Sequence, residues 1–132
     1  PTSPFRTSNL VDKALDVYVK SSKDIYTTLR AISKTREHPG KMWVKLSESR
    51  MSKLLPFHTK NIPWSDQSYS TLPPTYIQNA SIEIGSIEGI LNGMPISGYS
   101  TIPFICEGKE VVDINTPEDL EYANYLAEKF SI

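Results

Sequence analysis

The chain has 132 residues, of which 39% are hydrophobic and 22% are charged, and its formal net charge at pH 7 is -1. This is the composition of an ordinary globular protein, so it excludes a disordered polymer and argues against a polyanion-binding surface and a nucleic-acid partner. No segment approaches the roughly 20 consecutive apolar residues that a membrane-spanning helix needs, so we expect no membrane association and a cytoplasmic location.

The chain opens with a loop signature. Residues 1–6 (Pro-Thr-Ser-Pro-Phe-Arg) are typical of the loop that leaves a buried strand, yet neither a strand nor an initiator Met precedes them. We therefore expect the chain to be the later part of a larger α/β domain. Apolar residues at helical spacing predict a helix over residues 9–20, capped by Thr7 or Ser8.

The middle of the chain is predicted to contain strands, a turn and a long excursion. Residues 25–32 and 42–46 have the composition of strands, and the Pro-Gly pair at 39–40 indicates a turn between them. Residues 47–74 are polar, with several prolines and scattered aromatic residues. Such a composition predicts an excursion with little packed regular structure, which protrudes and makes oligomer contacts.

The remainder of the chain alternates strands and helices. The final helix has the clearest start, because Thr116 is a capping residue and Pro117 stands in the first turn, where its missing N–H costs nothing. We expect one α/β domain over residues 1–132. Its other elements here are strands at 76–85, 101–106 and 111–114, and a short helix capped by Ser86 and ended by Gly93.

Two polar residues lie two positions apart at the end of the predicted strand 111–114. The side chains of Asp113 and Asn115 leave the same face of a strand and would converge on one ligand beyond its carboxyl end. A carboxylate and an amide oxygen suit Mg²⁺, which keeps waters and is completed by substrate phosphates. The alternative is that both residues only terminate the strand and support the cap at Thr116.

The opening loop is a candidate anion site. Thr2 and Ser3 offer hydroxyls, Arg6 offers a forked cation, and the following helix presents free N–H groups. The alternative is a plain turn and cap, because such clusters before helices are common. We expect the opening loop and the acid–amide pair to lie side by side and to face one magnesium-bound triphosphate.

Four short motifs occur in one order along the chain. They are residues 1–6, Glu-His-Pro at 37–39, Leu-Pro-Pro-Thr-Tyr-Ile-Gln-Asn-Ala at 72–80 and Val-Asp-Ile-Asn-Thr-Pro-Glu-Asp-Leu at 112–120. Their order and spacing resemble the acylneuraminate cytidylyltransferase family, the CMP-sialic acid synthetase-like enzymes that activate nine-carbon sugar acids with CTP. The resemblance covers nearly the whole chain and is weakest over residues 47–70.

The resemblance implies a Rossmann-like nucleotide-diphospho-sugar transferase fold, of which this chain would be a fragment without the N-terminal nucleotide-binding strands. It implies transfer of CMP from CTP to a nonulosonic sugar acid, with release of pyrophosphate, by a magnesium-dependent homodimer in surface glycan biosynthesis. Because no phosphate-gripping loop is present, we expect the chain alone not to catalyse the transfer. The alternative is a non-catalytic dimerisation module derived from the same fold.

The resemblance also implies roles for individual residues. Asp113 and Arg6 would be catalytic, and Asp113 and Asn115 would hold the metal. The residues implied to contact substrate are Thr2, Ser3, Lys41, Asn79 and Glu83.

Three of these positions carry an open question. Asn115 stands where the family has a second acid, which removes a negative charge from the metal site. Glu83 replaces an aromatic residue, and its carboxylate would repel an anionic sugar acid unless a cation intervenes. For Lys41 the alternative is a solvated surface lysine.

Overall fold

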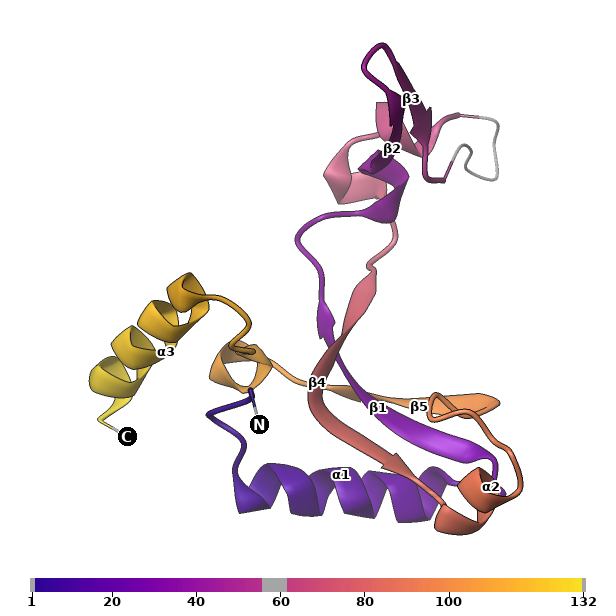
Figure 1. Cartoon of the computed structure of the whole chain (residues 1–132), viewed down its shortest axis with the longest axis vertical. Helices are drawn as coiled ribbons and strands as arrows, with labels where there is room; N and C mark the ends of the chain where they lie inside the picture. The colour runs from indigo at the N-terminus through magenta and orange to yellow at the C-terminus, as the bar shows by residue number, and fades with distance from the viewer. Residues whose placement is uncertain (1, 56–61, 132) are drawn as a thin grey trace. The chain divides into compact units, whose positions relative to one another are not determined.

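The computed structural model describes residues 2–55 and 62–131, which form two compact units (Figure 1). The first unit consists of Pro1–Ser33 and Gln78–Ile132, and the second of Lys34–Ile77. Strand β1 (Thr27–Lys34) runs from the first unit into the second, and strand β4 (Tyr76–Gly85) leads back.

The first unit contains a three-stranded mixed sheet with the order β4-β1-β5, where β5 is Ser100–Ile105. Strands β1 and β5 are parallel, in a register that sets Thr27 opposite Ser100 and Ile32 opposite Ile105. Strand β4 runs in the opposite direction to β1 (Figure 1). The second unit contains an antiparallel hairpin of β2 (Trp43–Ser47) and β3 (Arg50–Lys53).

The expected Rossmann-like fold is therefore wrong. That fold needs a series of parallel strands, whereas the strands of the described residues form one parallel pair, an antiparallel neighbour and an antiparallel hairpin. The reason lies in the excursion over residues 34–77. Because β1 leads into it and β4 leads out of it, the two strands pair in opposite directions, and an alternation of strands and helices in a sequence does not determine strand direction.

Helix α1 (Ser8–Ser21) packs on this sheet, as the predicted helix over 9–20 indicated. The Thr7 hydroxyl accepts a hydrogen bond of 3.2 Å from the Leu10 N–H and so caps the helix. Apolar side chains from the helix and all three strands, with the cysteine that follows β5, form the main core of this unit. Its buried members are Leu10, Ala14, Leu29, Ala31, Ile82 and Cys106.

Helix α3 (Pro117–Phe130) forms a second, smaller core in the same unit. Its start is confirmed, because Thr116 and Asp119 make a reciprocal capping box and Pro117 occupies the first turn. Ala123 and Leu126 of the helix pack against residues from two other parts of the chain. The buried members of this core are Phe5, Val112, Ala123 and Leu126.

The strand expected at 111–114 is wrong. A 3-10 turn, η4 (Gly108–Val111), stands there and is followed by extended chain. Gly108 adopts a φ of 58° and the Val112 N–H donates to the Lys109 carbonyl, so the chain turns instead of entering the sheet. Asp113 and Asn115 consequently follow a turn and not a strand.

The other predicted elements are present with small shifts of boundary. Helix α2 (Ile87–Leu91) is capped by Ser86, and Gly93 follows it with a φ of 86°. The excursion is more regular than expected, since its described part contains β3 and 3-10 turns η2 (Trp64–Asp66) and η3 (Tyr69–Thr71). A further 3-10 turn, η1 (Pro39–Lys41), forms the predicted turn. Residue 1 of the opening motif and residues 56–61 of the excursion lie outside the described residues.

Candidate functional site

The opening loop and the segment around Asp113 lie side by side. The backbone N–H of Ile114 donates a hydrogen bond of 2.8 Å to the carbonyl of Thr2. Nearby, Phe5 and Val112 pack into the same small core. The prediction that these two segments lie side by side in the fold is confirmed, although Thr2 and Ile114 are 112 positions apart in the sequence.

The carboxyl group of Asp113 has a lowered pKa, and its two oxygens differ in their hydrogen bonds. Its Oδ2 accepts a hydrogen bond of 2.8 Å from the Asn115 side-chain amide. The hydroxyl of Thr2, and after it the amide of Asn115, hold the pKa of Asp113 below its ordinary value. Its other oxygen, Oδ1, is buried and has no hydrogen-bond partner among the described residues. Asp113 therefore carries an ionised carboxylate with one unused acceptor.

These residues fit a magnesium ion that is shared with a substrate. Mg²⁺ is commonly held by one or two protein oxygens, while phosphates and waters complete its shell. Asp113 would supply Oδ1, and Asn115, whose Nδ2 faces Asp113, would supply its amide oxygen. The part of the chain that the structure describes holds no cluster of three His, Cys, Asp or Glu side chains, so a closed protein cage is not formed there.

The alternative role, support of the helix cap, is also visible and involves different atoms. One carboxylate oxygen of Asp119, Oδ2, accepts hydrogen bonds from the backbone N–H groups of Asn115 (3.0 Å) and Thr116 (2.9 Å). The N–H of Asn115, and after it that of Thr116, lower the pKa of Asp119. The backbone N–H of Asn115 thus takes part in the helix cap, whereas its side-chain amide donates to Asp113.

Arg6 and Glu83 line one pocket of the first unit, between α1 and β4. The pocket has a volume of about 510 Å³. Arg6 is exposed at this place, so its guanidinium is open to a ligand. The other lining residues are Val11, Leu15, Ser81, Ile82 and Ile84.

The charge of Glu83 is offset by Arg30, a residue that the sequence analysis missed. Arg30 Nη2 lies 3.3 Å from Glu83 Oε1, and Arg30 Nη1 donates to the side-chain oxygen of Gln78. The arginine side chain is only 16% exposed, because β1 lies between β4 and β5. The carboxylate of Glu83 is therefore paired with the guanidinium of Arg30 and is not an isolated negative charge. The cross-strand pairing that creates this contact leaves no local signal in the sequence.

Asn79 is engaged with its own strand. Its Oδ1 accepts hydrogen bonds from the Ser81 N–H (3.2 Å) and the Ser81 hydroxyl (2.6 Å), and Ser81 lines the pocket with Arg6. The Asn79 Nδ2 is buried and has no hydrogen-bond partner among the described residues. Asn79 thus holds Ser81 in place, and both N–H donors of its Nδ2 stay unused.

Ser3 and Lys41, the two remaining residues predicted to contact substrate, differ from the others in burial and in the unit to which they belong. Ser3 is buried, in contrast with Thr2 and Arg6, which are exposed. Lys41 belongs to the second unit, where its ammonium donates to the Ser65 carbonyl at 3.1 Å and lies 5.1 Å from the centre of the Tyr69 ring. These contacts contradict the alternative of a freely solvated lysine.

Comparisons with protein-family models and with curated protein sequences found no match for this chain. Among the described residues, no helix has the length and apolar character needed to cross a bilayer. What supports a function is therefore the set of four motifs together with the geometry of the residues they contain.

Proposed function

We propose that this chain carries part of a nucleotidyltransferase site, which transfers CMP from CTP to a nonulosonic sugar acid with release of pyrophosphate. The observation that carries this function is the hydrogen bond between Ile114 and Thr2, which sets the opening motif beside the unused carboxylate oxygen of Asp113. We propose similarity to the acylneuraminate cytidylyltransferase family from the four motifs alone. The sheet of this chain gives no support, because it is not the Rossmann-like sheet that the resemblance implied. A cytoplasmic location, where CTP is available, is part of the same proposal.

The proposed chemistry needs an anion-binding edge. The anomeric hydroxyl oxygen of the sugar acid bonds to the α-phosphorus of CTP, its proton is released, and the bond from that phosphorus to pyrophosphate breaks. Asp113 and Asn115 would hold Mg²⁺, which when bound offsets the charge of the phosphates. Arg6 would bind a phosphate or the sugar carboxylate through its forked donors. The hydroxyl of Thr2 lowers the pKa of Asp113, because it favours the charged carboxylate.

The pocket lined by Arg6 and Glu83 is the proposed place for the sugar acid. Arg6 would attract the carboxylate of the sugar, and Glu83 would accept hydrogen bonds from hydroxyl or amide groups. The arginine partner of Glu83 removes the repulsion that an unpaired acid would exert on this ligand.

Ligand binding to the complete chain tests this function. Backbone amide signals would be followed by NMR during titration with CTP, with N-acetylneuraminic acid and with Mg²⁺. We expect magnesium-dependent shifts at Thr2, Asp113 and Asn115 with CTP, and shifts at Arg6 and Glu83 with the sugar acid. Pyrophosphate release measured in the same samples reports whether the chain alone turns over.

Variants of the metal pair sharpen this test. Asp113→Ala should abolish the magnesium dependence of CTP binding, and Asn115→Asp should strengthen it by adding a negative charge. Asp12→Ala, which removes an exposed acid of α1, is the matched control and should change nothing. If Asp113→Ala keeps the magnesium dependence, or if CTP shifts none of these amides, the function is refuted.

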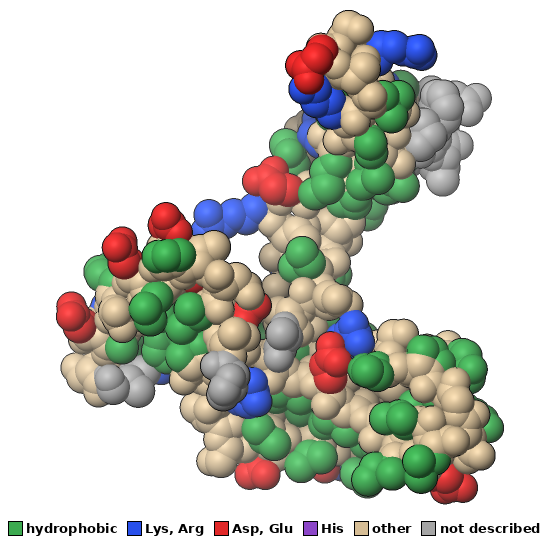
Figure 2. Space-filling model, in the orientation of Figure 1, with side chains coloured by type: hydrophobic (Ala, Val, Ile, Leu, Met, Phe, Trp, Pro, Cys, Tyr) green, Lys and Arg blue, Asp and Glu red, His purple; other side chains and the backbone are tan. Residues whose placement is uncertain are grey.

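An interaction module is the second candidate, and the β2–β3 hairpin favours it. Its apolar side chains are largely exposed in the single chain, among them Leu46 at 60% and Met51 at 64%. Figure 2 shows apolar side chains at the surface around this hairpin. Such side chains are often covered by a second copy. Sedimentation equilibrium should show a dimer that Leu46→Lys with Met51→Lys dissociates and that Ile87→Lys, in the first unit, leaves intact. Dimerisation without any binding of CTP or sugar acid would favour the module over the enzyme.

A further inference from the structure

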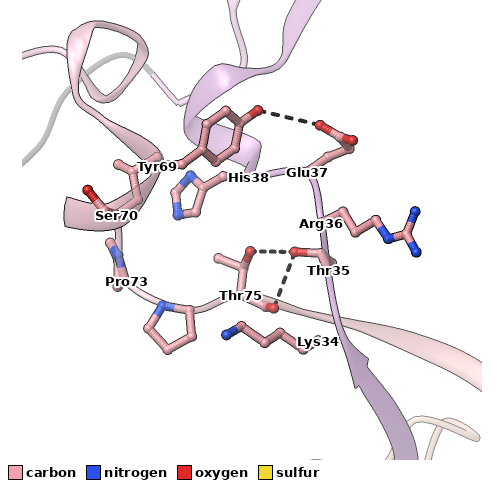
Figure 3. A pocket seen from close by; sticks show the side chains of 11 residues that line it. Lys34, Thr35, Arg36, Glu37, His38, Tyr69, Ser70, Pro73 and Thr75 are labelled. Atoms are coloured by element: carbon pink, nitrogen blue, oxygen red, sulfur yellow. Dashed lines mark hydrogen bonds between the residues drawn. The ribbon is translucent and has the colours of Figure 1, made fainter. Parts of the chain in front are cut away.

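A second pocket lies within the second unit and contains none of the residues assigned above. Its volume is about 360 Å³, and its walls come from residues 34–38 at the end of β1 and from residues 69–70 and 72–75 before β4 (Figure 3). The Thr35 N–H donates a hydrogen bond of 3.0 Å to the Thr75 carbonyl and ties the two walls together. Two segments far apart in the sequence therefore hold the pocket.

His38 gives this pocket a buried hydrogen-bond donor. The residue is only 5% exposed, and its ring stacks on Trp64 with the ring centres 5.1 Å apart. Its Nδ1 accepts a hydrogen bond of 2.9 Å from the Gly40 N–H, so the proton of the neutral ring is on Nε2. That Nε2 is buried and has no hydrogen-bond partner among the described residues. Buried donors are nearly always paired, so the missing partner is an acceptor atom of a ligand or of a water molecule that a ligand can displace.

The same proton position argues against a metal ligand. A metal binds an unprotonated ring nitrogen, whereas Nδ1 of His38 is engaged with Gly40 and Nε2 carries the proton. The described residues also place no group of three metal-binding side chains anywhere in this unit. The pocket is suited to an oxygen acceptor instead.

The charges around the pocket select an anionic oxygen. Lys34 and Thr75 both line the pocket, and in the view of Figure 3 the Lys34 side chain extends toward the side where Thr75 lies, whereas the guanidinium of Arg36 points away from His38. Glu37, the acid of the lining, is turned toward the Tyr69 hydroxyl, with 3.4 Å between the two oxygens. An N–H donor and an ammonium on the walls of one pocket are groups that bind carboxylate and phosphate oxygens.

The two threonines can accept a hydrogen bond from a ligand. The Thr35 hydroxyl donates to the Thr75 carbonyl at 3.2 Å. The two hydroxyl oxygens are 2.7 Å apart, and either hydroxyl can donate to the other. Whichever one donates, the pair keeps acceptor lone pairs. A hydroxyl group of a ligand would satisfy them.

We propose that this pocket is a binding site for a small hydroxylated anion. The acidic group accepts from His38 Nε2 and pairs with Lys34, and a hydroxyl group donates to the threonine pair. Phosphate monoesters and hydroxy acids share this chemistry, and the site is independent of the residues around Asp113.

The test uses the complete chain and two matched pairs of probes. Glycerol 3-phosphate is compared with propyl phosphate, and gluconate with hexanoate, so that each pair differs in its hydroxyl groups. Binding is followed through the His38 ring nitrogens in long-range proton–nitrogen NMR spectra, which also report the tautomer. We expect at least one hydroxylated probe to shift the Nε2 signal and to bind about tenfold tighter than its partner without hydroxyls.

Variants keep the inference falsifiable without relying on His38 alone. Lys34→Gln should weaken binding of the preferred probe about tenfold, and Thr75→Val should remove its advantage over the partner without hydroxyls. Lys13→Gln, on the exposed face of α1, is the matched control and should leave binding unchanged. Glycerol 3-phosphate binding identifies a phosphate site, and gluconate binding a carboxylate site. No Nε2 shift with any probe at millimolar concentration, or equal binding within both pairs, would overturn the proposal.

Discussion

The carboxylate of Asp113 accepts a hydrogen bond from the side chain of Asn115, and the hydroxyl of Thr2 lowers its pKa further than that amide does. Thr2→Val should therefore raise the pKa of Asp113 toward its ordinary value of 3.8, and by more than Asn115→Ala does. Carbon-13 NMR titration of the Asp113 carboxyl measures both shifts. Thr101→Val, a change elsewhere in the same unit, is the control, and an unchanged Asp113 pKa in Thr2→Val would contradict the contact.

Stability should decrease in acid because Asp113 and Asp119 both have lowered pKa values in the folded chain. A carboxyl whose folded pKa lies below the unfolded value, about 3.9 for Asp, stabilises the fold fully above that value. The contribution is lost as the pH falls through the folded pKa. Urea unfolding between neutral pH and pH 2 should show this decline, and Asp119→Asn should make it shallower. A decline of the same size in both proteins would show that Asp119 contributes nothing.

The capping box at Thr116 should matter for the last helix. Thr116→Ala removes the hydroxyl that accepts from the Asp119 N–H at 3.2 Å, and should lower the free energy of unfolding by about 1 kcal/mol. Thr116→Ser keeps the hydroxyl and is the matched control. Urea unfolding compares the three proteins, and equal loss in both variants would indicate that the methyl group and not the cap is responsible.

The pair of Arg30 and Glu83 should contribute a modest coupling. Glu83 is 40% exposed at its side chain, so solvent screens the attraction and we expect a coupling energy of about 1 kcal/mol or less. A double-mutant cycle with Arg30→Met and Glu83→Gln measures it by urea unfolding. Strictly additive effects of the two substitutions would mean that the contact contributes no stability.

Two glycines separate backbone strain from steric overlap. Gly93 and Gly98 both have positive φ angles, 86° and 72°, which residues other than glycine rarely adopt. A Cβ at residue 98 would lie 2.6 Å from the Thr28 hydroxyl oxygen, whereas a Cβ at residue 93 would meet nothing within 4 Å. Gly93→Ala should cost about 1 kcal/mol of stability and Gly98→Ala roughly 1–3 kcal/mol more. Thermal unfolding compares them, and equal losses would contradict the predicted overlap with Thr28.

Local signals in the sequence predicted the helices well. The cap at Thr7 and the apolar spacing that follows it lie within a few residues of each other, as do Thr116 and Pro117. Each helix start can therefore be predicted from one short segment of sequence. The sheet depends on pairing between distant segments. The parallel register of Thr27 with Ser100 and the return of β4 have no such local signal, which is why the predicted sheet was wrong.

For the candidate site too, the sequence predicted residues that lie in local motifs and missed residues whose contacts come from distant segments. The motifs identified Thr2 and Asp113, and the expectation that their two segments lie side by side is confirmed by the hydrogen bond between Ile114 and Thr2. Arg30 and the unused Nε2 of His38 were missed, because one depends on a partner across the sheet and the other on a ring whose surroundings come from another segment. Apolar spacing also predicted a strand around Val112, where a glycine-led turn forms instead.

The small core that joins Phe5 to Ala123 and Leu126 has a consequence for how the protein is made. A ribosome builds the chain from its amino end, so Phe5 emerges long before the helix that covers it. The small core can form only once α3 has been translated. Until then the Phe5 ring lacks the helix residues that bury it, and a truncation before Ala123 would leave this core incomplete.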